Sequence, residues 1–97
     1  MRILKELERS GTVPIILALN QLKKGKFTDI YYESIRMGFR AGGGVISRRL
    51  DQLYALGWVQ KMKNEEGSKI FTLTENGFRL AKAIKEFTQS LEKNKVN

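Results

Sequence analysis

The chain has 97 residues, enough for one domain with a single modest core. Its 18 Lys and Arg against 10 Asp and Glu give a formal net charge of +8, which favours a polyanionic partner because neutralised phosphates release condensed counterions. The absence of Cys and His excludes disulfides, thiolate nucleophiles and the usual zinc, copper or iron sites, and no nucleophile–base pair or phosphate loop indicates catalysis.

The amino-terminal segment is expected to form a short helix, because Ile3, Leu4 and Leu7 recur at helical spacing. Glu6 and Glu8 interrupt its apolar pattern, so it is not a signal peptide, and no stretch of the chain reaches the length of a membrane span. The sequence thus predicts a cytoplasmic protein without a membrane partner.

A second helix is predicted from Thr12 to Leu22, with Thr12 as its N-cap and Pro14 in the first turn, where a missing N–H costs little. Apolar residues surround most of this helix, which is typical of a central core helix. Thr28 is expected to cap a third, short helix, and Asp29 suits the positive end of that helix.

The segment 36–44 contains four glycines in nine residues, so it is predicted to be a turn or a mobile loop. We favour the interpretation that Gly42, Gly43 and Gly44 adopt positive φ and let the turn bend. The alternative is that their free N–H groups meet a phosphate.

A fourth helix is predicted from Gly44 to Leu56, where the helical period returns. Its apolar stripe consists of Ile46, Leu50, Leu53 and Leu56. Gly57 then provides the left-handed stop with which many helices end. The next residues predict a β-hairpin, with strands at 58–63 and 68–74 around a turn at 64–67.

The outward face of this fourth helix is centred on Arg48 and includes Gln52, because a helix turns by about 100° per residue. Arg can grip guanine and Gln can grip adenine in bidentate fashion, whereas Arg49 at the shoulder suits a phosphate. The residues predicted to contact DNA from this helix and the turn before it are Arg40, Gly44, Ser47, Arg48, Arg49 and Gln52. The alternative is an ordinary solvated face that binds nothing.

The hairpin carries Lys61, Lys63 and Lys69 near its tip, so it is predicted to be a second, basic arm that contacts the adjacent DNA backbone. Thr74 is expected to cap a last helix, whose apolar stripe is longer than one wall of a small domain needs. Together with the amino-terminal helix it predicts a homodimer interface formed by Ile3, Leu4, Leu7, Leu80, Ile84, Phe87 and Leu91. The alternative is that both helices only close the core of a monomer.

The order and spacing of these features resemble the winged helix-turn-helix regulators of the MarR-like and HxlR-like kind. The resemblance rests on Ser47, Arg48, Leu50, Leu53, Gly57, Trp58 and Val59, followed by Leu73, Thr74 and Gly77. It implies a dimeric transcriptional regulator on pseudo-palindromic double-stranded DNA, with one helix in the major groove and the wing beside the minor groove. Two features depart from the pattern: Glu65 and Glu66 stand at the wing turn where an Arg is expected, and glycines precede the recognition helix in place of a Ser/Thr cap.

The predicted fold is therefore α+β and mostly helical, a single winged helix-turn-helix domain over residues 1–97. The helix-turn-helix spans 28–56, the two-stranded wing 58–74, and the terminal helices 1–11 and 78–93. The expected function is sequence-specific transcriptional regulation by a homodimer, without enzymatic activity, cofactor or metal.

Two other functions stay open at this stage: a non-specific or architectural DNA-binding protein, and a winged-helix module that binds protein. The aromatic residues Tyr31, Tyr32 and Phe39 either pack within the fold or line a pocket for an effector, which the sequence does not name.

Overall fold

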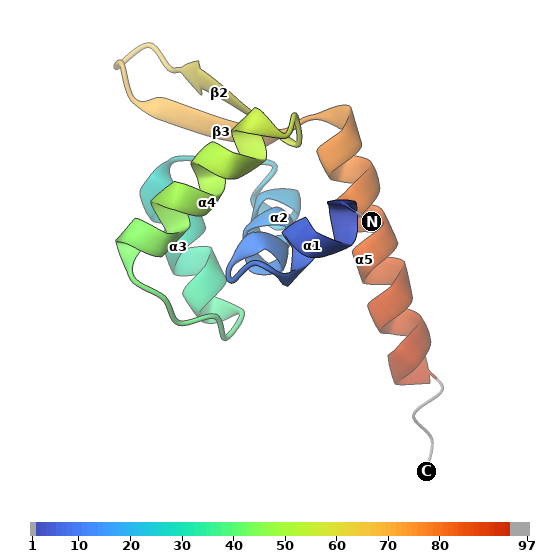
Figure 1. Cartoon of the computed structure of the whole chain (residues 1–97). Helices are drawn as coiled ribbons and strands as arrows, with labels where there is room; N and C mark the ends of the chain where they lie inside the picture. The colour runs from blue at the N-terminus through green and yellow to red at the C-terminus, as the bar shows by residue number, and fades with distance from the viewer. Residues whose placement is uncertain (1, 94–97) are drawn as a thin grey trace.

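The computed structural model describes residues 2–93, and the side chains of residues 5–92. Its elements in chain order are α1 (Arg2–Glu8), α2 (Thr12–Leu22), β1 (Lys24–Gly25), α3 (Phe27–Arg36), α4 (Gly43–Ala55), β2 (Val59–Lys63), β3 (Lys69–Leu73) and α5 (Glu75–Lys93). The helices α1 to α4 lie on one side of a small sheet, and the β2–β3 hairpin projects beyond them (Figure 1). This is the winged helix-turn-helix fold predicted from the sequence.

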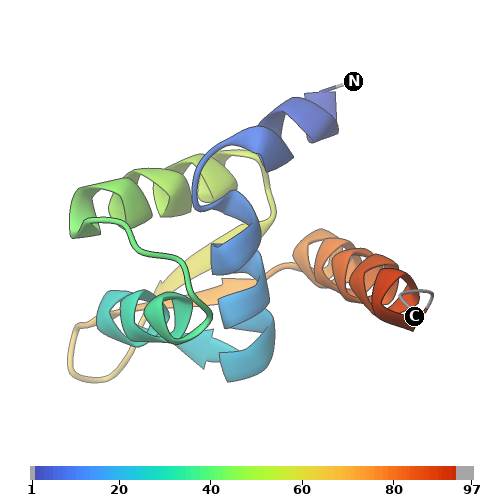
Figure 2. The ribbon, with the colours of Figure 1, turned by 90° about the horizontal axis from the view of Figure 1, so that it is seen from below.

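The core forms around α2, as its apolar circumference predicts. Ile15, Ile16, Ala18 and Leu19 are completely buried, and α2 contacts α3, α4, α5 and the sheet. The view from below shows α2 between α3, α4 and the strands (Figure 2). Helix burial of this kind supplies most of the stability of a small domain, because short helices are marginal alone.

The sheet has three strands in the order β1-β3-β2, one more than the sequence predicts. The hairpin pairs Val59 with Leu73 and Lys63 with Lys69, and Lys24 of β1 pairs with Thr72 on the other edge of β3. Strand β1 has only two residues, too few to show the alternation that identifies a strand in a sequence. Its pairing with β3 attaches the base of the wing to the end of α2.

Two predicted helix caps are wrong. Helix α2 is preceded by Gly11, with φ of 90°, and Thr12 lies inside the first turn and is buried. Helix α3 begins at Phe27, one residue before the predicted cap, because the Lys26 N–H donates to Oδ2 of Asp29 (2.9 Å). The carboxylate replaces the threonine hydroxyl as the group that holds the helix start.

The Thr74 cap of α5 is confirmed. The Gly77 N–H donates to Thr74 Oγ1 (3.2 Å), and the same hydroxyl donates to the Gly57 carbonyl (2.6 Å). One side chain therefore connects the residue that follows α4 and its C-cap to the start of α5. Gly57 itself has φ of 83°, as the predicted left-handed stop requires.

Helix α5 leaves the body of the domain after its first turns (Figures 1 and 2). Ala81 is completely buried against the body, whereas Phe87 and Leu91 are 66% and 56% exposed. Leu80 and Ile84 pack against the edge of the core, and Leu7 of α1 is half-buried. The side chains of Ile3 and Leu4 lie outside the described residues. None of the described helices has the length and apolar composition that crossing a membrane requires.

Candidate nucleic-acid interface

Helices α3 and α4 form the helix-turn-helix, joined by a turn over residues 37–42. Helix α4 begins at Gly43 and ends at Ala55, each one residue before the predicted bound. Ile46, Leu50 and Leu53 are almost completely buried, which confirms the inward stripe. Their burial fixes the rotation of the helix, so residues half a turn away face solvent.

The outward face of α4 presents Ser47 and Arg48, both exposed. Within residues 5–92, Arg48 makes no ion pair and no hydrogen bond to another side chain. Arg40 is also exposed, in the turn that leads to the helix. Among the described residues, the guanidinium of Arg48 is thus free on the exposed face of α4.

Two other predicted contact residues are held within the fold. The Arg49 Nε–H donates to the Ser10 carbonyl (2.7 Å), and its NH1 group donates to Gln52 Oε1 (2.8 Å). Both side chains are half-buried. Arg49 and Gln52 therefore lie beside the α1–α2 turn, on the shoulder of α4 that faces the N-terminal part of the chain.

The opposite shoulder of α4 is connected to the wing. Lys61 Nζ lies 3.0 Å from Asp51 Oδ1 and 4.5 Å from the centre of the Tyr54 ring. Neither Asp51 nor Tyr54 is among the contact residues predicted from the sequence. Their spacing of three residues places both on one face of α4, which could have indicated a shared partner. That partner, Lys61, lies on another element, so the spacing alone does not identify it.

The remaining wing lysines, Lys63 and Lys69, face each other across β2 and β3. Both are exposed, and neither has an acidic partner within residues 5–92. Like charges directly opposite each other in a sheet are destabilising, so this pair favours a bound anion. Glu65 and Glu66 are exposed at the turn, which Asn64 Oδ1 closes by accepting from the N–H groups of Glu66 and Ser68.

The favoured interpretation of the glycine run is wrong. Among the described residues, positive φ occurs at Gly11, Gly38, Gly57 and Gly67 and at one lysine, and not at Gly42, Gly43 or Gly44. A Cβ added at Gly42 or Gly44 would meet open space, and one at Gly43 would only touch the Phe27 ring. Neither backbone conformation nor packing requires glycine at the start of α4, so its surface there is simply free of side chains.

The aromatic residues considered for an effector pocket have packing partners. Tyr31 stacks on Phe27 with ring centres 6.1 Å apart and meets the edge of Tyr32 at 5.4 Å. Phe39 lies over Gly11, where an added Cβ would be 3.2 Å from its ring.

Near the end of α3, the Arg36 guanidinium donates to the Glu33 carboxylate. This hydrogen bond lowers the pKa of Glu33 and raises that of Arg36. The pair stabilises the last turn of α3 and does not belong to the exposed face of α4.

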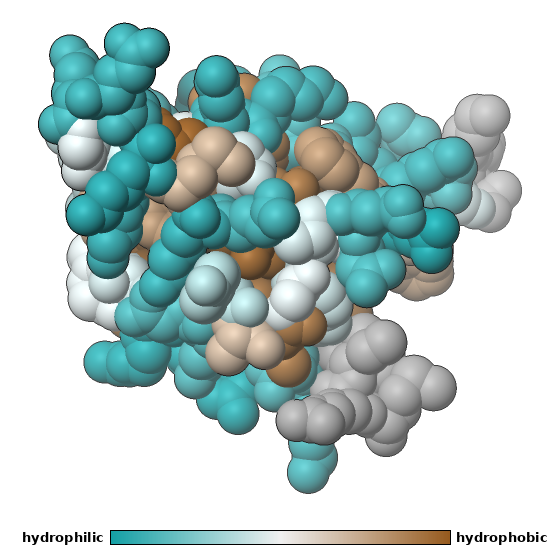
Figure 3. Space-filling view, turned by 90° about the horizontal axis from the view of Figure 1, so that it is seen from above, coloured by the Kyte–Doolittle hydropathy of each residue, from teal (hydrophilic) through white to brown (hydrophobic). Residues whose placement is uncertain are grey.

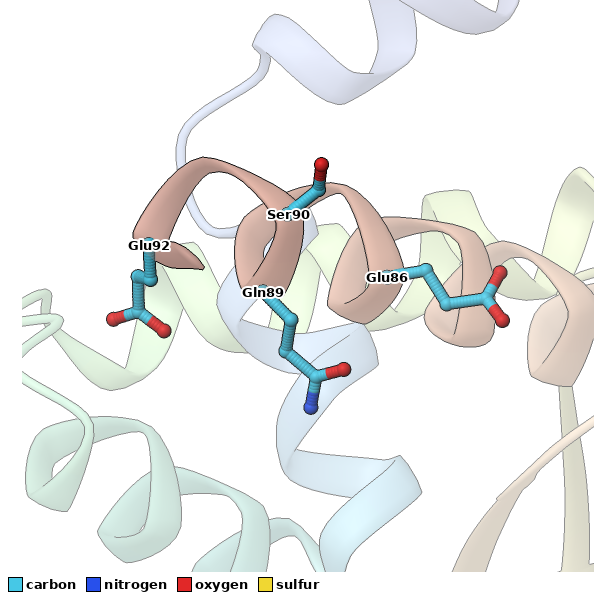
Figure 4. A pocket seen from close by; sticks show the side chains of 4 residues that line it. All are labelled: Glu86, Gln89, Ser90 and Glu92. Carbon is cyan, nitrogen blue, oxygen red and sulfur yellow. The ribbon is translucent and has the colours of Figure 1, made fainter. Parts of the chain in front are cut away.

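Several hollows lie in the surface formed by the described residues. One hollow along α5 is lined by Glu86, Gln89, Ser90 and Glu92. Figure 4 shows that these side chains come from a single helix and point in different directions. Within the described residues, no group of three or more acidic side chains is placed to hold a metal ion.

Another groove lies between α3, α4 and the wing, and it adjoins the exposed face of α4 at Ser47. It has a volume of about 480 Å³, and its polar lining includes Lys26, Ser47, Asp51, Ser68 and Lys69. The space-filling view from the wing side shows hydrophilic side chains over most of this end of the molecule (Figure 3). The outward face of α4 and the inner side of the wing therefore border one groove, whose floor also includes the apolar Phe27, Leu50 and Phe71.

The sequence matches no protein-family model and no curated protein. Solved structures do match the fold. A possible HxlR family transcriptional factor from Thermoplasma volcanium gives a TM-score of 0.75 at 24% identity, over 98% of this chain and 83% of that one. A MarR family transcriptional regulator from Silicibacter pomeroyi gives 0.77 at 14% identity, over 96% and 60%. Sso10a-2, a DNA-binding protein from Sulfolobus solfataricus, gives 0.63 at 27% identity, over 86% and 83%. The predicted resemblance to MarR-like and HxlR-like proteins is thus confirmed at the level of the fold.

Proposed function

We propose that this protein is a sequence-specific, double-stranded-DNA-binding transcriptional regulator that acts as a homodimer. Helix α4 would enter the major groove, and the wing would lie against the flanking backbone. The observation that carries the proposal is that Arg48 on α4 and Lys63 and Lys69 on the wing are exposed and have no acidic partner within residues 5–92. The structural neighbours described as transcriptional regulators or as DNA-binding support the same function.

The contacts divide into two kinds. Ser47 and Arg48 are proposed to read base edges, with Gly44 and Arg40 at the approach to the helix. Lys63 and Lys69 are proposed to contact phosphates. Lys61 would join them only where DNA displaces its pair with Asp51.

The deciding experiment is the selection of bound sites from random duplex DNA with the full chain, followed by a salt titration on the selected site. We expect a palindromic motif and a preference over random DNA of about 10³-fold or more. Binding without enrichment would favour the architectural alternative. No binding to either DNA would favour a module that binds protein.

Lys63→Ala is expected to weaken binding to selected and random DNA by the same factor, because a phosphate contact carries no sequence information. The slope of log K against log salt should become shallower by about one unit. Lys24→Ala removes the same charge from β1 and is the control. Equal slopes for Lys63→Ala and the wild-type protein would contradict a phosphate contact at the wing.

The homodimer part of the proposal rests on α5. A helix of 19 residues is about 28 Å long, and its outer half leaves Phe87 and Leu91 exposed. In a chain of this size, burying two large apolar side chains in a second copy stabilises both copies appreciably.

We expect Phe87→Glu combined with Leu91→Glu to convert the dimer into a monomer, because a symmetric interface would contain both charges twice. Sedimentation velocity measures the change. Gln89→Glu, which adds a negative charge on another face of the same helix, should leave the dimer intact. A wild-type protein that sediments as a monomer at all concentrations would refute the dimer. This result would not bear on the proposed DNA contacts.

A further inference from the structure

The basic residue next to Arg48 has a different environment from Arg48. Arg49 is half-buried, and both of its hydrogen bonds go to groups of this chain, the Ser10 carbonyl at 2.7 Å and Gln52 Oε1 at 2.8 Å. These two bonds fix the guanidinium of Arg49 against its own chain, on the shoulder of α4. The Ser10 carbonyl lies 39 positions away in the sequence, so the contact joins two distant segments.

The Ser10 carbonyl has no backbone donor at the expected position in the first turn of α2. Four residues further on stands Pro14, which has no N–H, so the first turn of α2 cannot supply the i+4 hydrogen bond. The neighbouring carbonyls are used: Arg9 accepts from Thr12 N–H (3.1 Å) and Gly11 accepts from Ile15 N–H (3.0 Å). Arg49 therefore supplies a hydrogen bond that the backbone of the turn leaves open.

The turn is also enclosed by side chains. Gly11 is buried with φ of 90°, and a Cβ built there would lie 3.2 Å from the Phe39 ring and 3.5 Å from Arg49 Cγ. Phe39 belongs to the segment that leads into α4, and Arg49 belongs to α4 itself. The α1–α2 turn is thus held between two parts of the helix-turn-helix.

We propose that Arg49 is a positioning residue, which fixes the angle of the recognition helix by holding it to the α1–α2 turn, and not a DNA contact. The pair of Asp51 and Lys61 holds the other shoulder of the helix to the wing, so Arg48 is presented between two attachments. This assignment rests on the proposed function of α4. Because Ser10 follows α1 directly, a displacement of α1 would also move the group that Arg49 holds.

The test compares variants that keep or remove the charge. Arg49→Lys keeps the positive charge but loses the planar guanidinium, which holds two acceptors at once. Positioning predicts that both Arg49→Lys and Arg49→Ala lower the preference for the selected site over random DNA by about five- to tenfold, as for a weakened base contact. The salt slope should stay unchanged. A phosphate contact predicts that Arg49→Lys keeps its affinity and that Arg49→Ala flattens the slope by about one unit, and this result would overturn the proposal.

A second variant, Gly11→Ala, disturbs the same contact by changing the α1–α2 turn. Gly11→Ala places a methyl group against Phe39 and Arg49, at a buried position that DNA cannot reach. Gly38→Ala is the matched control, because Gly38 also has positive φ (97°) but has open space where the methyl would lie. Positioning predicts that Gly11→Ala lowers the site preference and that Gly38→Ala does not, at temperatures where both remain folded by circular dichroism. Equal preferences for the two variants would overturn the proposal.

Hydrogen exchange without DNA separates this inference from the proposed function. In Arg49→Lys, the amides of Thr12 and Ile15, which donate to the carbonyls of Arg9 and Gly11, should exchange faster than in the wild-type protein, because the turn has lost its attachment. Unchanged exchange would show that Arg49 does not hold the turn. If the wild-type protein selects no DNA site, the proposed function fails, and the exchange experiment still decides whether the attachment exists.

Discussion

Arg48→Ala is expected to weaken binding to the selected DNA site by about 1–3 kcal/mol, the range for loss of one bidentate base contact. Binding to random DNA should weaken much less, so the variant loses specificity more than affinity. The physical reason is the position of the side chain: the buried Ile46, Leu50 and Leu53 point the opposite face of α4, with Arg48 at its centre, away from the body. Fluorescence anisotropy with labelled duplexes of both kinds measures the difference.

Arg79→Ala is the control for the lost charge. Arg79 is exposed on α5, where it pairs with Glu75 at 3.4 Å, and its removal should change neither the affinity nor the specificity appreciably. An equal loss on selected and random DNA in Arg48→Ala would assign Arg48 to the backbone. Base readout would then have to come from other residues of α4.

Gly77→Ala is expected to lower the free energy of unfolding by at least about 3 kcal/mol, beyond the usual cost of overpacking. A Cβ at position 77 would lie 2.2 Å from the Trp58 carbonyl oxygen and within 3.2 Å of Leu73. The oxygen is part of the backbone and accepts from the Thr74 N–H (3.0 Å), so it cannot move aside without breaking the junction of wing and helix. Urea denaturation followed by circular dichroism measures the loss.

Gly44→Ala makes the same chemical change in open space. It should raise the free energy of unfolding by about 0.4–1 kcal/mol, because alanine restricts the unfolded chain and the native backbone accepts it. Similar stabilities of the two variants would contradict the close approach at Gly77. The close approach also explains why glycine stands at position 77, since the start of α5 can lie against the Trp58 carbonyl only without a side chain there.

Several features of the interface could be predicted from short stretches of sequence. The stripe of Ile46, Leu50 and Leu53 specifies which face of α4 is buried, and this is sufficient to turn Arg48 outward. The hairpin follows from two short strands around a turn, and the Thr74 cap follows from one hydroxyl before a helical pattern. These predictions succeed because the interactions that decide them act between residues close in sequence.

The interpretation of the glycine run failed for a related reason. Three successive glycines permit positive φ but do not require it, and the structure shows that Gly42 has an ordinary extended conformation. The glycine content shows only which φ and ψ angles are accessible to this segment. Which of them it adopts depends on how residues 37–42 connect α3 to α4 in the folded chain.

By itself, the sequence determined the order of the helices, the wing and the rotation of α4 about its axis, because periodicity and turn chemistry are local. The tertiary structure alone decided how the basic residues around Arg48 are used. The helical period separates the outward Arg48 from Arg49 at the shoulder, but only the folded chain brings Arg49 against Ser10 and Lys61 against Asp51, whereas Arg48 has no such partner within residues 5–92. These contacts join segments that meet only when the chain folds, so the helical period predicts which cation faces outward but not which cations are bound within the fold.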